Sequence, residues 1–451
     1  MTGHCSGLVW KPFSMATPAP PAVKVKAIDK FSLPMIRAVV KRPRLTEAIF
    51  GRTRWGNTFA PGTASNPYPN YEPMRADGPA AWNPCFQQWF ITGYDEAREV
   101  LSSPAVEVSG QRELILSIKP HSEMSETSKE LFRHFLLFVD PPDHTRLRAL
   151  VSRAFTPKQI ARMEPEVARI AHHLLDDVAD HDTVDMFAAY NAPLPIHVIS
   201  SLLGIPEERW PFTVELSLAL IQYLDPFPEF VPAEVDATLN KGVQFFDDLI
   251  EERRLDPKDD LISALVAAEE GDDRLTRFEV VAVAMFLMFA GHETTSGALG
   301  NSMVAMAKFP AQRELIRDNP DLWPNAVEEL LRYDAPLQVD PRAAATDFTV
   351  GGETIKAGKR ILVVLGAANR DPRRWDNPNN LQLDREDPRP ISFGHGIHHC
   401  IGAALARMNL RIGMQVFLDR FGDYTIDAES VVWKEHAVLR GPIELPISSS
   451  E

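Results

Sequence analysis

The sequence predicts a mainly α-helical protein with small β-sheets, built around one long central helix. Three observations support this fold class. Helix-type periodicity recurs through most of residues 128–333, an apolar run over 280–291 fills the middle of the longest expected helix, and short β-type stretches lie on either side of this helical part. No repeat and no low-complexity linker interrupts the middle of the chain, which favours one large domain.

The expected elements follow in order along the chain. We expect a Pro- and Ala-rich flexible extension over residues 1–30 and a single folded domain over 31–451. A strand is expected over 86–91, a helix over 95–102 and a loop over 103–127. Further elements are helices over 128–138, 143–153, 157–179, 194–203, 207–222, 232–254, 258–268, 276–308, 310–318, 322–333 and 403–420, strands near 348–355 and 360–364, and a long irregular segment over 366–392.

Composition and charge argue against several classes of function. The 451 residues carry a formal net charge of -15, which is unfavourable for a nucleic-acid binder. The cysteines Cys5, Cys85 and Cys400 do not form a disulfide framework, so a reducing, cytoplasmic location is expected. No apolar run reaches the roughly 18–20 residues that span a bilayer, and no secretion signal is evident, so we expect no membrane association.

One glycine-bracketed loop carries the strongest chemical signal. The stretch from Phe393 to Gly402 delivers Cys400 to the start of the helix expected over 403–420. Unpaired backbone N–H groups and the positive end of the helix dipole both favour a thiolate at this position. The glycines lack side chains, so the backbone can pass close to a planar, bulky ligand. This combination suits a thiolate ligand to haem iron.

Two other interpretations of this loop remain open. A lone cysteine near a helix start is usually a buried small hydrophobe. His395, His398, His399 and Cys400 could also suggest zinc, but structural zinc takes its ligands from two separated pairs, and no second pair follows at that spacing. Haem therefore explains the loop better than zinc does.

An acid and an alcohol interrupt the most apolar part of the chain. Thr276-x-x-Glu279 is a capping-box start for the helix expected over 276–308, which would be about 50 Å long. Glu293 and Thr294 are expensive to bury in the middle of such a helix. A hydrogen bond from Thr294 back to the helix and an Arg partner for Glu293 would satisfy both groups. Alternatively, the two side chains relay protons to a reacting group.

These separated motifs resemble, in their order, the cytochrome P-450 family in its soluble bacterial form. The resemblance covers roughly residues 67–447 and rests on DPPDHTRLR at 140–148, AGHETT at 290–295, ELLR at 329–332 and the cysteine loop. It implies the cytochrome P-450 fold, with a long central helix over haem b. It also implies a monooxygenase that inserts one oxygen atom of O2 into a C–H bond of a small apolar molecule.

The resemblance assigns residues around the haem. Cys400 is the expected iron ligand, and Thr294 and Glu293 are the expected alcohol and acid of proton delivery. His144 and Arg148 lie at i, i+4, so both can face one propionate. The residues expected to bind the cofactor are Cys400, Phe393, Gly402, His144, Arg148, Arg342, His398, Ala290 and Gly291, with Gly291 leaving room for dioxygen.

The same resemblance assigns structural residues and a substrate pocket. Glu329, Arg332 and Arg385 are expected to form a buried cluster that holds the cysteine loop in place, although a solvated surface pair is the ordinary reading of Glu and Arg at i, i+3. Residues 103–127 and 215–232 are expected to form the lid. The expected pocket residues are Met285, Phe289, Ala290, Leu337, Val339 and Val438.

Electrons are expected from a separate protein, because the chain carries no flavin or nicotinamide motif. We expect a ferredoxin with its reductase, docking on a patch formed by Arg407, Arg411 and Arg146. Two alternatives to the ferredoxin-driven monooxygenase are a peroxide-driven peroxygenase of the same fold and a haem-based gas sensor or carrier. The acid–alcohol pair favours the monooxygenase over both.

Overall fold

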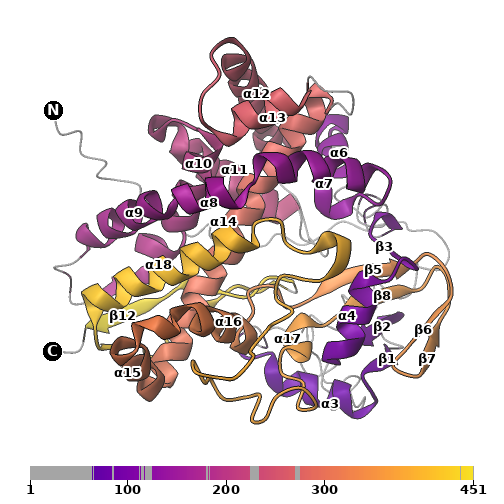
Figure 1. Cartoon of the computed structure of the whole chain (residues 1–451), viewed down its shortest axis with the longest axis vertical. Helices are drawn as coiled ribbons and strands as arrows, with labels where there is room; N and C mark the ends of the chain where they lie inside the picture. The colour runs from indigo at the N-terminus through magenta and orange to yellow at the C-terminus, as the bar shows by residue number, and fades with distance from the viewer. Residues whose placement is uncertain are drawn as a thin grey trace.

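The computed structural model describes residues 63, 65–83, 86–110, 112, 116, 124–178, 181, 183–223, 233–269, 275–436 and 438–449. The expected extension over 1–30, the cysteines Cys5 and Cys85, and parts of both expected lid segments lie outside these residues. The described part is mainly helical with small sheets, as the sequence predicts (Figure 1).

The helices surround one long member, α14, which runs through the middle of the molecule (Figure 1). Within the described residues they are α3 (Tyr71–Ala76), α4 (Tyr94–Ser102), α6 (Glu126–Arg133), α7 (Asp143–Ala154), α8 (Pro157–Arg162), α9 (Glu164–Asp176), α10 (Pro193–Leu203), α11 (Trp210–Tyr223), α12 (Ala233–Leu255), α13 (Leu261–Glu269), α14 (Arg277–Lys308), α15 (Pro310–Asp318), α16 (Trp323–Tyr333), α17 (Leu365–Ala368) and α18 (Ala403–Phe421).

The strands of the described residues form four small sheets. The largest has the order β1 (Ala80–Asn83), β2 (Gln88–Ile91), β8 (Arg360–Val363), β5 (Asp340–Ala344) and β3 (Val106–Glu107), with β2 and β8 parallel and the other neighbours antiparallel. The others pair β4 (Thr183–Asp185) and β9 (Tyr424–Thr425) with β12 (Pro446–Ser449), β6 (Phe348–Val350) with β7 (Glu353–Ile355), and β10 (Val432–Trp433) with β11 (Pro442–Glu444).

The core is centred on α14. The expected capping box is present: Thr276 Oγ1 accepts from the Glu279 N–H, and the Glu279 carboxylate accepts from the Thr276 N–H. The helix packs against α10, α11, α12 and α18. It is long and apolar enough to cross a membrane, but 72% of its most apolar window is buried inside the protein, as expected for a core helix.

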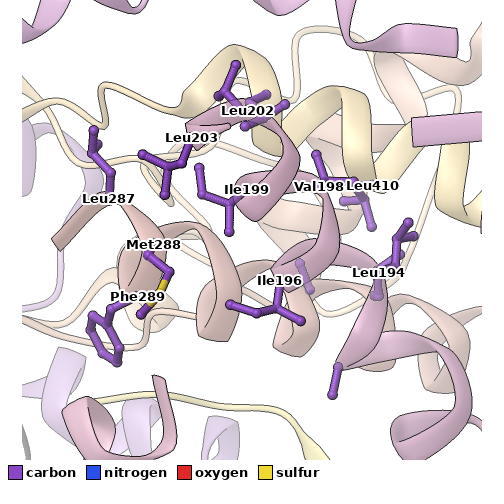
Figure 2. Packing of buried hydrophobic residues seen from close by; sticks show 14 of the residues in the cluster. Leu194, Ile196, Val198, Ile199, Leu202, Leu203, Leu287, Met288, Phe289 and Leu410 are labelled. Atoms are coloured by element: carbon purple, nitrogen blue, oxygen red, sulfur yellow. The ribbon is translucent and has the colours of Figure 1, made fainter. Parts of the chain in front are cut away.

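Apolar side chains from three helices interlock around α14. Burying each leucine or isoleucine of this kind stabilises the fold by about 1.5–3 kcal/mol. Figure 2 shows the contributing residues Leu194, Ile196, Val198, Ile199, Leu202 and Leu203 of α10, Leu287, Met288 and Phe289 of α14, and Leu410 of α18.

Two expected helices differ from the structure. The helix expected over 157–179 is broken, because α8 ends at Arg162 and α9 begins at Glu164. Pro165 lies in the first turn of α9 and has no N–H to donate to the preceding turn. The helix expected over 128–138 ends at Arg133 and is followed by a 3₁₀ turn over Leu136–Phe138.

The strand β5 was missed by sequence reasoning. It contains Pro341, which cannot donate a ladder hydrogen bond and therefore argues against a strand. The structure nevertheless pairs Pro341 with Leu362 of β8 and Arg342 with Ile361. This strand matters for function because it positions the Arg342 side chain.

Candidate active site

The cysteine loop is held by backbone bonds that require glycine. The Cys400 N–H donates to the Phe393 carbonyl at 2.8 Å, which closes the loop. Gly394 and Gly396 both have φ near +70°, a region that side chains disfavour. A Cβ on Gly396 would also lie 2.3 Å from the Leu101 carbonyl oxygen. The loop geometry therefore fixes where the sulfur atom sits.

The electrostatics of Cys400 differ from the sequence-based expectation. Burial raises the pKa of the thiol, and the Gly402 N–H, Arg148 and Arg407 offset only part of this rise. The expected backbone donor therefore acts in the predicted direction, but desolvation outweighs it in the protein without a bound metal. A bound metal cation would supply the missing positive charge and deprotonate the sulfur.

Two neighbouring histidines beside the cysteine each have a buried ring nitrogen without a hydrogen-bond partner among the described residues. His144 at the start of α7 and His398 of the cysteine loop have ring centroids 4.2 Å apart, and neither Nε2 atom has a hydrogen-bond partner. Burial lowers the pKa of both rings, that of His398 to about 3. Buried polar atoms normally find a partner, so this pair indicates a ligand with acceptor atoms.

Two arginines flank the histidines. Arg148 Nη2 donates to the His399 carbonyl, so its guanidinium lies at the cysteine loop. Arg342 on β5 is 4% exposed and donates to the Asp340 carboxylate and the Pro341 carbonyl. The four expected propionate ligands thus converge from α7, β5 and the loop. Two neutral donors and two cations fit the two carboxylates of haem.

One face of α14 is only partly covered by other side chains, and we call it the uncovered face. Between residues 280 and 303 every side chain is buried except Phe286, Ala290, Gly291 and Thr294. Phe286, Ala290 and Thr294 follow at i, i+4 spacing, so they share one face of the helix. This face interrupts an otherwise closed core and includes the expected alcohol.

The expected pocket residue Met285 lies in the core between two helices. It is fully buried, and its methyl group lies 2.9 Å from where a Cβ on Gly242 of α12 would be. Met285 therefore packs between α12 and α14, and its role in a substrate pocket stays a prediction. The neighbouring Phe286 occupies the uncovered face, with its ring 5.4 Å from that of Phe135. The i, i+4 spacing from Ala290 and Thr294 was a signal that could have found it.

Gly291 has a packing reason of its own. A Cβ on it would lie 3.3 Å from Ile199 Cγ1 of α10, which is tighter than ordinary contact. Glycine at this position therefore lets α10 and α14 approach closely, in addition to any role beside the haem. Phe289 is buried in the same core.

Glu293 has a partner that the sequence did not reveal. Its Oε2 accepts from Lys434 Nζ, and its Oε1 lies 3.8 Å from His292 Nδ1. Burial alone would raise the pKa of the carboxyl, but Lys434 and His292 hold it below its usual range. The structural alternative considered for Glu293 had an arginine as its partner, and the observed partner is a lysine. No sequence spacing links residues 293 and 434, which only the packing of the C-terminal segment on α14 brings together.

Thr294 makes the expected bond back to its own helix. Its Oγ1 donates to the Ala290 carbonyl at 2.8 Å. This bond satisfies the hydroxyl donor but leaves the oxygen able to accept. The side chain is partly exposed on the uncovered face of α14. The position of Thr294 therefore allows both a hydrogen bond to its own helix and a role in proton delivery.

The expected buried cluster behind the loop is formed. Glu329 and Arg332 of α16 are completely buried, and Arg332 Nε and Nη2 donate to the Glu329 carboxylate at 2.6 and 2.8 Å. Arg385 Nε donates to the same carboxylate at 3.0 and 3.1 Å. The two arginines also donate to the carbonyls of Asn369, Asp376, Asn377, Pro378 and Asn380. The solvated-pair reading is therefore wrong, and the cluster fixes the irregular segment.

Three expected pocket residues come together from distant parts of the sequence. Leu337 forms an isolated bridge with Leu439, and the Gln338 N–H donates to the Val438 carbonyl at 2.9 Å. Leu337 and Val438 are partly exposed, whereas Val339 is 3% exposed and packs in a separate apolar cluster. Val339 therefore has almost no exposed surface with which to contact a ligand.

The three arginines of the expected docking patch are all paired. Arg407 pairs with Glu328 and lies over the Phe393 ring at 4.4 Å. Arg411 Nη2 lies 2.7 Å from Glu164. Arg146 binds the buried Glu279. Docking of a ferredoxin on these residues stays a prediction. The carboxylate partners offset part of the positive charge that would attract it.

Comparison with known proteins agrees with this geometry. The family model for Cytochrome P450 matches residues 89–442. The chain is 37% identical to Cytochrome P450 CYP107DY1 of Priestia megaterium over 80% of this chain and 89% of that protein. It is 36% identical to 6-deoxyerythronolide B hydroxylase of Saccharopolyspora erythraea, over 80% of this chain and 89% of that protein. The solved structure of Bacillus subtilis PksS matches with a TM-score of 0.78 and 32% identity, covering 88% of this chain and 100% of that chain.

The chain therefore belongs to the cytochrome P450 family and has its fold. It is a P450 monooxygenase, and its cofactor is haem b.

Proposed function

We propose that this monooxygenase hydroxylates a small apolar molecule with electrons from a separate protein. One observation carries the proposal. A partly buried cysteine lies beside His144 and His398, whose buried Nε2 atoms have no hydrogen-bond partner among the described residues, and a buried acid and an alcohol interrupt the apolar core helix. The first half of this arrangement suits haem, and the second suits proton delivery.

In this proposal the cysteine side holds the cofactor. Cys400 Sγ is the iron ligand, and His144, Arg148, Arg342 and His398 hold the two propionates by charge-assisted hydrogen bonds. Phe393 and Gly402 shape the loop around the sulfur, whereas Ala290 and Gly291 lie on the opposite side. When bound, haem supplies the iron chemistry that activates dioxygen.

On the other side, Thr294 and Glu293 handle protons. The Thr294 hydroxyl donates a hydrogen bond to the Ala290 carbonyl. After rotation about χ1 it can donate towards the uncovered face instead. Glu293 is held as a carboxylate next to Lys434, whose side chain is 18% exposed. A proton can therefore reach the buried acid from the surface along this pair.

The substrate pocket would be apolar. We assign its wall to Phe286, Phe289, Ala290, Leu337 and Val438, with Val339 behind it. The relatives include proteins named for 6-deoxyerythronolide B, mycinamicin IV and vitamin D(3). These names support a bulky apolar substrate without selecting one.

We assign electron supply to a ferredoxin and its reductase, and the location to the cytoplasm. The support is the absence of a flavin or nicotinamide motif from the sequence and the similarity to bacterial P450 proteins. Acidic donors of this kind associate faster with a basic face.

The test is a substrate screen followed by turnover. Candidate substrates are ranked by the spin-state shift of the haem spectrum, and product is then measured with a ferredoxin system and with hydrogen peroxide alone. We expect product with the ferredoxin system, and we expect Thr294→Ala to divert several-fold more electrons to hydrogen peroxide.

Two outcomes would contradict the proposal. Equal turnover with peroxide alone and no effect of Thr294→Ala would indicate a peroxygenase. Binding of carbon monoxide without turnover of any substrate would indicate a gas sensor or carrier.

A further inference from the structure

We propose that Gln338 is a positioning residue for substrate specificity. It fixes two chain segments of the pocket wall against each other and thereby turns Leu337 towards the bound molecule. The first segment is 335–339, and the second is formed by Val438 and Leu439. This role rests on the pocket proposed above and deepens it, because it identifies the residue that decides which side chains a substrate meets.

Leu337 is the exception in a buried stretch of chain. From 331 to 340 every residue is buried except Leu337. Leu337 forms an antiparallel bridge with Leu439, so the chain is extended at this point. Successive side chains of an extended chain point to opposite sides. Because Gln338 points into the protein, the direction of Leu337 is tied to that of its neighbour.

The side-chain amide of Gln338 is held by three hydrogen bonds inside the protein. Its Oε1 accepts from the Tyr71 hydroxyl at 2.7 Å, and its Nε2 donates to the Ala335 carbonyl at 2.7 Å and to the Tyr68 hydroxyl at 3.3 Å. Gln338 and Tyr71 are 5% and 2% exposed. If the amide left this place, the Tyr71 hydroxyl would lose its acceptor where water cannot easily replace it.

The backbone of Gln338 also joins three parts of the chain. Its N–H donates to the Val438 carbonyl at 2.9 Å, and its carbonyl accepts from the Gly366 N–H at 3.1 Å. A Cβ on Gly366 would lie 2.1 Å from Gln338 Oε1, so glycine at this position leaves room for the amide. A slip of one residue in this pairing would turn Leu337 away from the pocket. Gln338 therefore fixes the register of the two pocket segments.

A buried ion pair anchors the same wall on the other side of Leu337. Arg440 Nε donates to the Asp334 carboxylate at 2.7 Å, and the Arg440 N–H donates to the Pro336 carbonyl at 2.7 Å. The Tyr68 hydroxyl donates to the same carboxylate at 2.7 Å. Loss of the Gln338 amide should therefore change the direction of Leu337 without detaching the two segments from each other.

A pocket wall that is fixed in this way selects ligands by shape. An apolar pocket distinguishes molecules by the space that its side chains leave. A wall that has to be ordered when the ligand binds costs affinity. Freeing Leu337 should therefore weaken the binding of a bulky ligand and leave that of a small one nearly unchanged.

The test compares two probes on the haem-loaded protein, imidazole and 4-phenylimidazole. Both bind the iron through a ring nitrogen, and only the second places a phenyl group in the pocket. Gln338→Met keeps the length of the side chain and removes its polar atoms. We expect it to weaken 4-phenylimidazole about fivefold relative to imidazole, as measured by spectral titration.

Two further variants keep the Gln338 side chain and disturb its place. Tyr71→Phe removes the hydroxyl that donates to Oε1, and Gly366→Ala puts a methyl group where Oε1 lies. Each should shift the ratio of the two dissociation constants in the same direction, by about twofold or more. The proposal therefore stays testable even if Gln338→Met does not fold.

Tyr190→Phe is the matched control for Tyr71→Phe. Tyr190 is completely buried, and its hydroxyl donates to the Gly413 carbonyl of α18 at 2.8 Å. This variant should lose a similar amount of stability in denaturant unfolding without changing the ratio of the two dissociation constants.

An unchanged ratio in the folded variants of Gln338, Tyr71 and Gly366 would overturn the proposal. So would an equal change in Tyr190→Phe, because any loss of a buried hydrogen bond would then have the same effect. The probes bind without electrons or dioxygen. The result is therefore independent of whether the chain hydroxylates a substrate.

Discussion

The two sides of the candidate haem site are built in opposite ways. On the cysteine side, functional residues are fixed by many bonds: Glu329 alone holds two arginines, and the cysteine loop needs glycines at positive φ. On the α14 side, Glu293, His292 and Thr294 stand in apolar surroundings with few polar partners each.

The difference reflects what each side has to do. A metal ligand must stay in one position, so a dense, completely buried ion network is useful there despite its desolvation cost. Groups that pass protons must change partners, and a side chain with one or two hydrogen bonds does so easily. We therefore expect substitutions on the cysteine side to cause loss of the cofactor. Substitutions on the α14 side should change the share of electrons that is released as hydrogen peroxide instead of being used to form product.

The largest expected effect is that of Cys400→Ser. Without the sulfur ligand, the thiolate-type spectrum of the reduced carbon monoxide complex should disappear and turnover should fall to background. The fold should persist, because most of the apolar core lies in the helices around α14. The check is the carbon monoxide difference spectrum together with circular dichroism. A variant that keeps the thiolate-type spectrum would refute the assignment of Cys400.

Next in size is Glu329→Gln. It leaves Arg332 and Arg385 buried without their carboxylate, which should destabilise the fold by about 3–5 kcal/mol and reduce haem content. Glu328→Gln is the matched control, because Glu328 is the adjacent residue but forms a part-exposed pair with Arg407. We expect less than about 1 kcal/mol for the control in denaturant unfolding. Equal effects would show that the buried cluster has no special role.

A smaller effect with a distinctive pH dependence is expected for Lys434→Met. In the native protein the pKa of Glu293 is held below its value in the unfolded chain. The ionised carboxylate therefore stabilises the fold at pH values above the unfolded pKa, and this stabilisation is lost as the pH falls through the folded pKa. Without Lys434, burial dominates and the pKa of Glu293 rises above its usual range.

The sign of the pH dependence should therefore reverse. The Lys434→Met variant should be less stable than the native protein by about 1–3 kcal/mol at neutral pH and should recover as pH falls towards about 5. Denaturant unfolding across this range measures it. A constant difference between the two proteins at all pH values would mean that Lys434 does not control the Glu293 charge.

The smallest effect is expected at the surface of the cysteine side. Arg411→Glu breaks an exposed pair with Glu164, so stability should change by less than about 1 kcal/mol. If this face receives an acidic ferredoxin, the association rate should fall a few-fold at low salt and less at high salt. No change in donor affinity at low salt would place the docking site elsewhere.

Much of the helical framework was predictable because its signals are local. The capping box at Thr276, the prolines at helix starts and the apolar run of α14 each act within a few residues. β5 was missed because the pairing of Pro341 is decided by β8, far along the chain. The full burial of Met285 was not predictable from spacing, because one residue turns a side chain by about 100° around a helix.

The sequence by itself determined the ligand types and their local geometry: a glycine-bracketed Cys400, a histidine and an arginine one turn apart on α7, and an acid beside an alcohol in a core helix. Only the tertiary structure decided their partners and charge states. Lys434 reaches Glu293, Ser217 reaches His292, and burial raises the pKa of Cys400. The physical reason is that desolvation and long-range contacts depend on which surfaces pack together, and no local spacing encodes that.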